Sequence, residues 1–66
     1  MKNRIKVARA ECNLSQGELA EKIGVSRQTI NSIETGRYIP STVLALKIAR
    51  TFEKMIEEIF QLEDSD

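Results

Sequence analysis

Apolar side chains recur every three or four residues along most of this chain, the spacing that places them on one face of a helix. The pattern predicts helices near residues 5–13, 16–23, 27–35, 42–52 and 55–62. The fourth carries the longest apolar stripe, formed by Leu44, Ala45, Ile48, Ala49 and Phe52. No segment alternates apolar and polar residues with a period of two, so strands are not expected. The predicted fold class is all-α, a compact domain of five short helices.

Polar residues and glycines mark the ends of these helices. The candidate N-caps, which can accept a hydrogen bond from the first turn, are Asn3, Ser15, Ser26 and Ser41. Ser15 with Glu18 forms a capping-box pattern. Gly24 and Gly36 follow the second and third helices, where glycine adopts the left-handed conformation without cost. The junction of residues 52–55 has no good cap and no glycine, so the last two helices meet in a strained bend or run on into each other.

Length and composition fit one small globular domain. The chain has 66 residues, of which 41% are apolar and 30% charged, a balance unlike that of disordered proteins. We expect residues 1–62 to form the domain and residues 63–66 to form a short acidic tail. No apolar run approaches the roughly 20 residues of a membrane span, and the basic start lacks the apolar stretch of a secretory signal. The sequence therefore predicts a soluble cytoplasmic protein.

Cysteine and histidine usage limits the chemistry that the chain can perform. Its single cysteine, Cys12, excludes an internal disulfide, and without histidine no zinc site of the usual kind can form within one chain. Cys12 is expected to lie on a helix among apolar neighbours, as a small buried hydrophobe. No histidine is present to activate a serine or threonine, and no glycine-rich loop could cradle a phosphate. The sequence predicts no enzyme, no metal site and no cofactor.

The net charge of zero hides an uneven distribution. Residues 1–50 contain nine Lys and Arg against four Glu, a net charge of +5, whereas residues 51–66 contain one Lys against six acidic residues, a net charge of −5. A chain with evenly distributed neutral charge would argue against nucleic-acid binding. A cationic body with an acidic tail is compatible with it. Charge alone fits a solvated surface equally well.

The segment 15–36 is the most informative part of the chain. Two short helices are joined there by the tight turn Gly24–Ser26, with Val25 filling the gap between them. Their shared apolar face consists of Leu19, Ile23, Ile30 and Ile33. The opposite face of the second helix consists of Arg27, Gln28, Asn31 and Ser32. Arginine matches the O6/N7 edge of guanine, and glutamine and asparagine match the N6/N7 edge of adenine. A plain solvated face would more often carry Glu and Lys, so these residues favour the reading of DNA bases.

The segments LSQGELAEKIGVSRQTINSIETGRYIPS and LALKIA resemble the Cro/C1-type, or XRE-like, helix-turn-helix regulators. The positions that agree together are Gln16, Leu19, Ala20, Gly24, Ser26, Ile30, Glu34, Gly36 and Pro40. With the flanking helices, the resemblance covers nearly the whole chain. It is strongest to the small stand-alone repressors of bacteria and phages, including the cytolysin-operon repressor type. It implies a lambda-repressor-like fold, with the helix-turn-helix at the second and third helices, and a repressor that binds palindromic double-stranded DNA as a homodimer.

The resemblance also implies a role for individual residues. The side chains that would face base edges in the major groove are those of Arg27, Gln28, Asn31 and Ser32. Those that would contact the DNA phosphates belong to Gln16, Ser26, Arg37 and Tyr38. Arg9 and Glu34 match a charged pair that ties the first helix to the end of the third, which implies a salt bridge that orients the reading helix.

A dimer is also expected on geometric grounds. A single recognition helix reads only about four base pairs, whereas two copies about 34 Å apart read a palindrome. Apolar residues that exceed what so small a core can use indicate where the copies meet. These residues all lie in the C-terminal third and are Val43, Leu46, Met55, Ile56 and Leu62.

Two other functions remain open. The first is a protein-interaction module, such as an antitoxin whose C-terminal third neutralises a toxin. The second is a non-specific nucleoid or single-strand binder. Tyr38 is the only aromatic residue outside the expected core that could stack on a base, which supports the second poorly. No small-molecule ligand is evident, and sequence-specific binding of duplex DNA is the function that the sequence favours.

Overall fold

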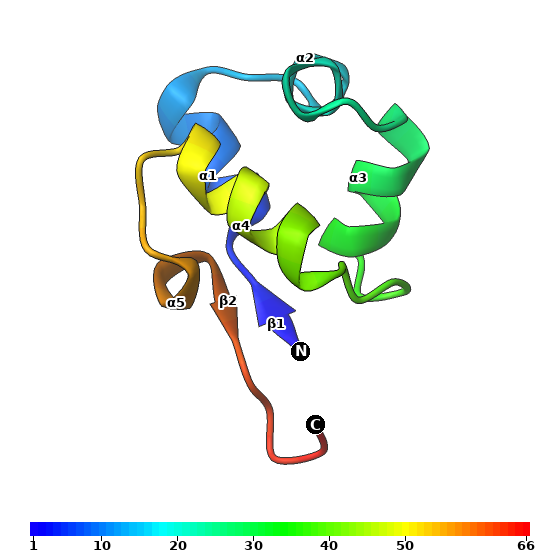
Figure 1. Ribbon diagram of the computed structural model, residues 1–66, viewed down its shortest axis with the longest axis vertical. Helices are drawn as coiled ribbons and strands as arrows, with labels where there is room; N and C mark the ends of the chain where they lie inside the picture. The colour runs from blue at the N-terminus through cyan, green and yellow to red at the C-terminus, as the bar shows by residue number, and fades with distance from the viewer.

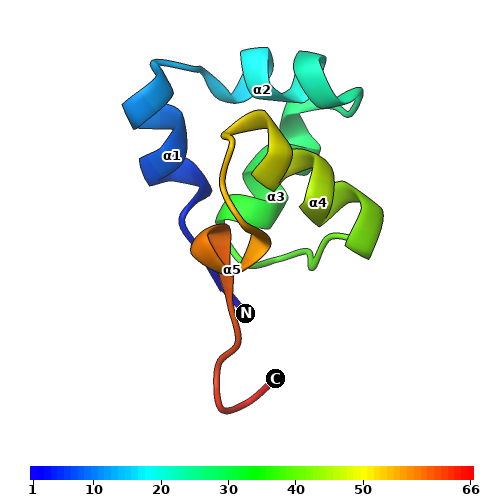
Figure 2. The ribbon, with the colours of Figure 1, turned by 60° about the vertical axis from the view of Figure 1, so that its left-hand side comes forward.

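The computed structural model describes all residues, 1–66, and contains the five expected helices. In chain order the elements are β1 (Lys2–Asn3), α1 (Ile5–Cys12), α2 (Gln16–Ile23), α3 (Arg27–Glu34), α4 (Thr42–Thr51), α5 (Ile56–Ile59) and β2 (Phe60–Gln61). Helix α4 crosses the middle of the molecule, with α1, α2 and α3 around it (Figure 1). Both termini lie at the end that holds α5 and the strands (Figure 1 and Figure 2). No helix is long and apolar enough to cross a membrane.

The core draws on every helix and is entirely apolar. The largest fully buried side chains are those of Ile5, Leu19, Ile30, Ile33, Ile48 and Ile59. The apolar stripe of α4 lies at the centre of this cluster, and α4 packs against both α2 and α5. Burial of a side chain such as Ile48 contributes about 1.5–3 kcal/mol, so the stripe holds α2 and α5 against α4.

The predicted caps around the helix-turn-helix are confirmed. The Ser15 hydroxyl accepts from the Glu18 N–H at 3.0 Å, and the Glu18 carboxylate accepts from the Ser15 N–H at 2.9 Å. This second bond lowers the pKa of Glu18. Ser26 caps α3 in the same way through the Thr29 N–H at 3.1 Å. Gly24 ends α2 with φ +79°, a left-handed conformation that other residues adopt only with strain. Gly24, Ser26 and Thr29 thus determine the turn between α2 and α3 locally.

The expectation that the chain forms no strand is wrong. Strands β1 and β2 form a two-residue antiparallel ladder that pairs Lys2 with Gln61 and Asn3 with Phe60. The adjoining Arg4 N–H donates to the Ile59 carbonyl at 2.8 Å. The last helix therefore ends at Ile59 instead of continuing to residue 62, because the N-terminal segment supplies backbone partners and the extended chain buries Phe60. Pairing between opposite ends of the chain leaves no periodic signal in so short a segment.

Two expectations for α1 also need correction. Asn3 is not its N-cap, because that position is occupied by Arg4, which makes no side-chain capping bond. The Asn3 amide instead links three segments, since its oxygen accepts from the Ile5 N–H at 3.3 Å and its nitrogen donates to the Ile33 carbonyl at 2.9 Å. Cys12 is exposed, not buried: it follows Ile5 and Ala8 at helical spacing but lies at the last position of α1.

A strained bend joins α4 to α5. Glu53 adopts φ +55°, the left-handed conformation that glycine usually supplies after a helix. Its N–H donates to the Arg50 carbonyl at 3.0 Å, and the Lys54 N–H donates to the Ala49 carbonyl at 3.0 Å. These two bonds form the Schellman arrangement that ends a helix. Helix α5 then begins after Met55, whose N–H donates to the Glu58 carboxylate at 3.0 Å. Of the two expected alternatives, the strained bend is the correct one.

We expect the substitution Glu53→Gly to stabilise the domain by up to about 1 kcal/mol. Glycine removes the left-handed strain of about 1–2 kcal/mol, and part of this gain is lost to the greater freedom of glycine in the unfolded chain. Thermal unfolding followed by circular dichroism measures the effect. The control is Glu53→Ala, which removes the same side chain and keeps the strain, so it should not stabilise. Equal melting temperatures for both variants would contradict the assignment of strain to this residue.

Candidate nucleic-acid interface

Helix α3 presents a polar face to solvent at the edge of the molecule (Figure 1). Its inner side chains, Ile30 and Ile33, are fully buried and hold the helix against the core. On the outer side, Arg27, Gln28 and Asn31 are exposed, and Ser32 is half-buried. The structure therefore brings the four predicted base-reading residues together on one accessible face.

Shallow depressions flank this face on both sides. One lies toward α2 and is lined by Gln16, Arg27, Gln28 and Asn31. The other lies toward the loop after α3 and is lined by Ser26, Gln28, Thr29, Ser32 and Tyr38. Helix α3 thus forms a ridge with hydrogen-bonding side chains along both flanks. A ridge of this kind is what insertion into the major groove requires, because the groove admits one α-helix.

A third depression surrounds the start of α2. It has no apolar lining residue and is formed by Arg9, Ser15, Gln16, Gly17 and Arg27. The N–H groups of Gln16 and Gly17 have no hydrogen-bond partner, as is usual in the first turn of a helix. Two guanidinium groups and the positive end of a helix dipole therefore meet in one place. This combination suits a phosphate group.

The Gln16 side chain is used within the protein. Its Nε2 donates to Asn31 Oδ1 at 3.2 Å and to Glu34 Oε1 at 3.1 Å. Both amide hydrogens are therefore engaged, so the side chain holds Asn31, one of the predicted base-reading residues, in place. The donors that α2 offers to a phosphate are its free backbone N–H groups, which extends the role expected for Gln16 from its side chain to its backbone. No sequence signal distinguishes these two uses of a glutamine.

Arg9 and Glu34 form a two-pronged ion pair. Arg9 Nε donates to Glu34 Oε2 at 2.6 Å, and Arg9 Nη2 donates to Glu34 Oε1 at 3.1 Å. Arg9 Nη1 also donates to the Leu14 carbonyl at 3.0 Å. Hydrogen bonding to Glu34 raises the pKa of the Arg9 guanidinium. Only 14% of the Arg9 side chain and 7% of the Glu34 side chain are exposed, so the pair joins α1 to the last turn of α3 at a largely desolvated site.

We expect Glu34→Ala to lower the free energy of unfolding by about 1–3 kcal/mol, because it leaves the Arg9 charge desolvated and unpaired. Affinity for duplex DNA should fall as well, since Gln16, which bonds to Asn31, loses the carboxylate that helps to hold it in place. Chemical denaturation and duplex titration measure the two effects. The matched control is Glu21→Ala, which removes an exposed glutamate of α2. If the two variants behaved alike, the ion pair would not hold α3 in position.

The other predicted phosphate contacts flank α3. Arg37 and Tyr38 are exposed in the loop after Gly36, and both of their N–H groups donate to the Ser32 carbonyl, at 2.9 and 3.2 Å. The loop is therefore anchored to the end of α3 while its side chains remain free. Ser26 is exposed at the start of α3, where its hydroxyl also lies 2.8 Å from the Thr29 hydroxyl.

Four of the five residues predicted for the dimer interface are exposed. Their exposed fractions are 63% for Val43, 50% for Leu46, 65% for Met55 and 81% for Leu62. Ile56 differs, because it is half-buried and packs against the core, so it offers less surface to a second copy than the other four. Sequence reasoning missed Ile39, which is 62% exposed. The sequence does indicate the exposure of Ile39. It lies between a helix that ends at a glycine and Pro40, so no helix can turn its side chain toward the core.

Comparison with known proteins places this geometry in a family. The helix-turn-helix family model matches residues 5–59, from the start of α1 to the end of α5. The chain belongs to the Cro/C1-type helix-turn-helix family. Members of this family bind double-stranded DNA and act as transcriptional regulators.

Relatives of this Cro/C1-type protein match it from end to end. An HTH-type transcriptional regulator of Methanocaldococcus jannaschii is 56% identical over 66 residues, which is all of both chains. The HTH-type transcriptional regulator YgzD of Bacillus subtilis is 47% identical, again over all of both chains. Among solved structures, the restriction-modification controller protein C.AhdI of Aeromonas hydrophila is 32% identical with a TM-score of 0.79, over 86% of this chain and 83% of its own.

Proposed function

We propose that this Cro/C1-type regulator is a repressor that binds a palindromic operator as a homodimer. The observation that carries the proposal is the polar face of α3, where Arg27, Gln28, Asn31 and Ser32 are presented as a ridge above a buried apolar face. Their side chains offer hydrogen-bonding groups suited to guanine and adenine edges in the major groove. Occupation of a promoter by the dimer would then block transcription.

Anchoring to the DNA backbone involves the depression at the start of α2. The free N–H groups of Gln16 and Gly17 would bind one phosphate, with Arg9 and Arg27 beside it. On the other flank of α3, Arg37 and Tyr38 would contact the backbone, together with Ser26. Phosphate contacts on both flanks determine the register in which the ridge meets the bases.

The two copies would meet through the exposed apolar residues of the C-terminal third, which are Val43, Leu46, Met55 and Leu62. Ile56, which is half-buried, would join this surface to the core. Exposed apolar side chains gathered in one part of a chain favour an interface between copies. The relatives are HTH-type transcriptional regulators, which favours this function over the antitoxin alternative.

Salt dependence and stoichiometry test the proposal together. Six to eight phosphate contacts per dimer would make log affinity fall with log salt at a slope of about −5 to −7. Fluorescence anisotropy of a labelled duplex gives the slope, and sedimentation of the complex should give two copies per duplex. A single strand of the same sequence is the control and should bind more weakly. A slope near zero, or one copy per duplex, would contradict the proposal.

A further inference from the structure

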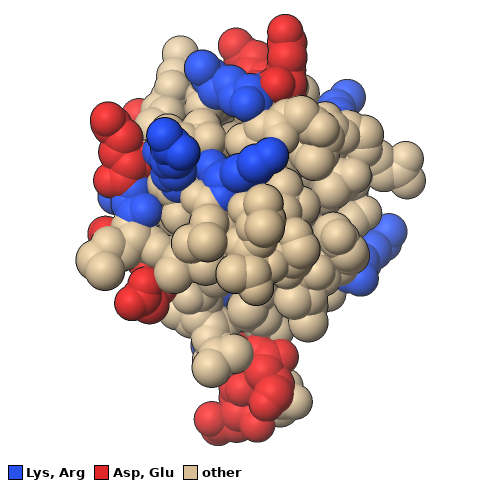
Figure 3. Space-filling model, in the orientation of Figure 1, with Lys and Arg blue, Asp and Glu red and all other residues tan.

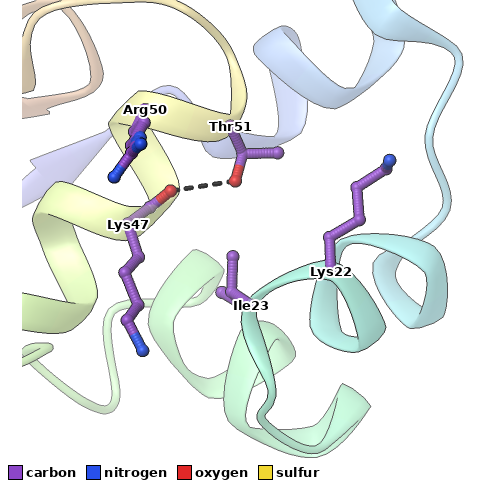
Figure 4. A pocket seen from close by; sticks show the side chains of 5 residues that line it. All are labelled: Lys22, Ile23, Lys47, Arg50 and Thr51. Atoms are coloured by element: carbon purple, nitrogen blue, oxygen red, sulfur yellow. Dashed lines mark hydrogen bonds between the residues drawn. The ribbon is translucent and has the colours of Figure 1, made fainter.

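A group of cations lies apart from the proposed DNA-binding face. Lys and Arg side chains gather on one side of the molecule, with acidic side chains beside them at the top and left edge, and a further acidic group lies at the lower tip (Figure 3). Lys22 from the last turn of α2 and Lys47 and Arg50 from α4 line one shallow depression together with Ile23 and Thr51 (Figure 4). We call Lys22, Lys47 and Arg50 the α2–α4 patch.

The α2–α4 patch forms no salt bridge within its own chain. The ion pairs of the protein join Arg9 to Glu34 and the N-terminal ammonium to Glu63 and Asp66, and none includes a patch residue. The hydrogen bond from the Ser15 N–H and, to a smaller extent, the charge of Lys22 lower the pKa of Glu18, which lies one turn before Lys22. Glu53 lies three residues after Arg50, and neither glutamate forms a salt bridge with the patch. Lys47 and Arg50 are three residues apart on one helix face, a spacing at which like charges repel each other. An anionic partner would relieve this repulsion.

The patch is separate from the surface assigned to DNA. None of its residues lines the three depressions around α3 and the start of α2. It contains no aromatic ring for base stacking, and its lining includes the Ile23 side chain. The chain's own acidic tail is a poor occupant, because the carboxylates of Glu63 and Asp66 already bind the N-terminal ammonium. These features fit carboxylates carried by another protein.

We propose that the α2–α4 patch docks an acidic segment of a second protein while α3 is bound to DNA. The carboxylates would pair with Lys22, Lys47 and Arg50, and the stem of one acidic side chain would lie over Ile23. The interaction would let a DNA-bound regulator recruit an acidic partner, or be controlled by it, through a surface of the helix-turn-helix fold itself.

Binding of a labelled oligoglutamate peptide tests the proposal, with an oligoglutamine peptide of equal length as the uncharged control. The protein is first saturated with a short duplex, so that the α3 face is occupied. The double variant Lys47→Glu/Arg50→Glu should weaken oligoglutamate binding by about tenfold, since exposed ion pairs contribute modestly and each reversal also adds repulsion. The matched variant Lys2→Glu/Lys6→Glu, with the same change of charge at exposed sites elsewhere, should change it by less than about twofold.

Three other results would overturn the docking proposal, and each points to a different explanation. Equal weakening by both double variants would show attraction to net charge alone. Displacement of the peptide by the duplex would place peptide binding on the α3 face. Loss of duplex affinity in Lys47→Glu/Arg50→Glu beyond that of the matched variant would make the patch a DNA contact. Because duplex binding is measured separately and circular dichroism verifies folding, these results are distinct from a failure of operator binding itself.

Discussion

Replacing Leu46 with glutamate is expected to convert the dimer to a monomer and to reduce operator affinity by about 100-fold or more. Leu46 is half exposed on α4, so the new carboxylate would enter the proposed interface without entering the core. A charge desolvated between two copies opposes association, and the second half-site then no longer binds as an intramolecular event. Sedimentation velocity measures the oligomeric state, and duplex titration measures the affinity.

The matched control is Val7→Glu, which places the same charge at an apolar position of α1 that is 44% exposed. This variant should remain dimeric and retain operator affinity. Val7→Glu should melt near the parent temperature, because Val7 is not buried, whereas Leu46→Glu should lose only the stabilisation that dimer formation provides. Ile56→Glu is a poorer choice, since Ile56 packs against the core and its replacement would destabilise the fold. A dimeric Leu46→Glu variant with full affinity would show that the copies meet elsewhere.

The second large effect is expected for Arg27→Ala, which should lower affinity for the preferred site by about 1–3 kcal/mol and relax base preference at one position of each half-site. Arg27 is exposed at the first position of α3 and lines two depressions, one along the polar face of α3 and one at the start of α2. From this position, the Arg27 guanidinium can contact either a base edge or a phosphate. Affinity for the preferred duplex and for single-base variants of it distinguishes the two uses.

Arg37→Ala is the natural comparison, because it removes the same charge from the loop after α3. We expect it to weaken binding to all duplexes by a similar factor, with no change in base preference, since phosphate contacts carry no direct sequence information. The salt slope should become shallower by about 0.9 for each phosphate that the variant dimer no longer neutralises. If both variants altered base preference equally, or neither did, the division between reading and anchoring residues would be wrong.

Local signals account for most of the fold that the sequence predicted. Ser15, Ser26 and Ser41 cap the helices that they were expected to cap, because a cap depends on residues three positions away. The β1–β2 ladder joins residues almost sixty positions apart, and two-residue strands are too short to show a period. Glu53 shows a similar limit, since nothing local indicates that a glutamate will adopt a left-handed conformation.

The sequence predicts which residues of the candidate site face outward, but not the contacts that they make with other helices. The outer face of α3 follows from helical spacing once Ile30 and Ile33 are assigned to the core. The destinations of the Gln16 amide hydrogens do not follow from spacing, because they depend on how α2 packs across α3. The α2–α4 patch was not anticipated either, since Lys22 and Lys47 are far apart in the sequence and meet only in the folded chain.

The most direct test of operator binding is a selection from a random duplex library, followed by sequencing of what the purified protein retains at physiological ionic strength. The account predicts a two-fold symmetric motif whose half-sites are centred about one helical turn, roughly 34 Å, apart. Retention of duplexes with no common motif would contradict sequence reading by α3 and leave binding driven by charge alone.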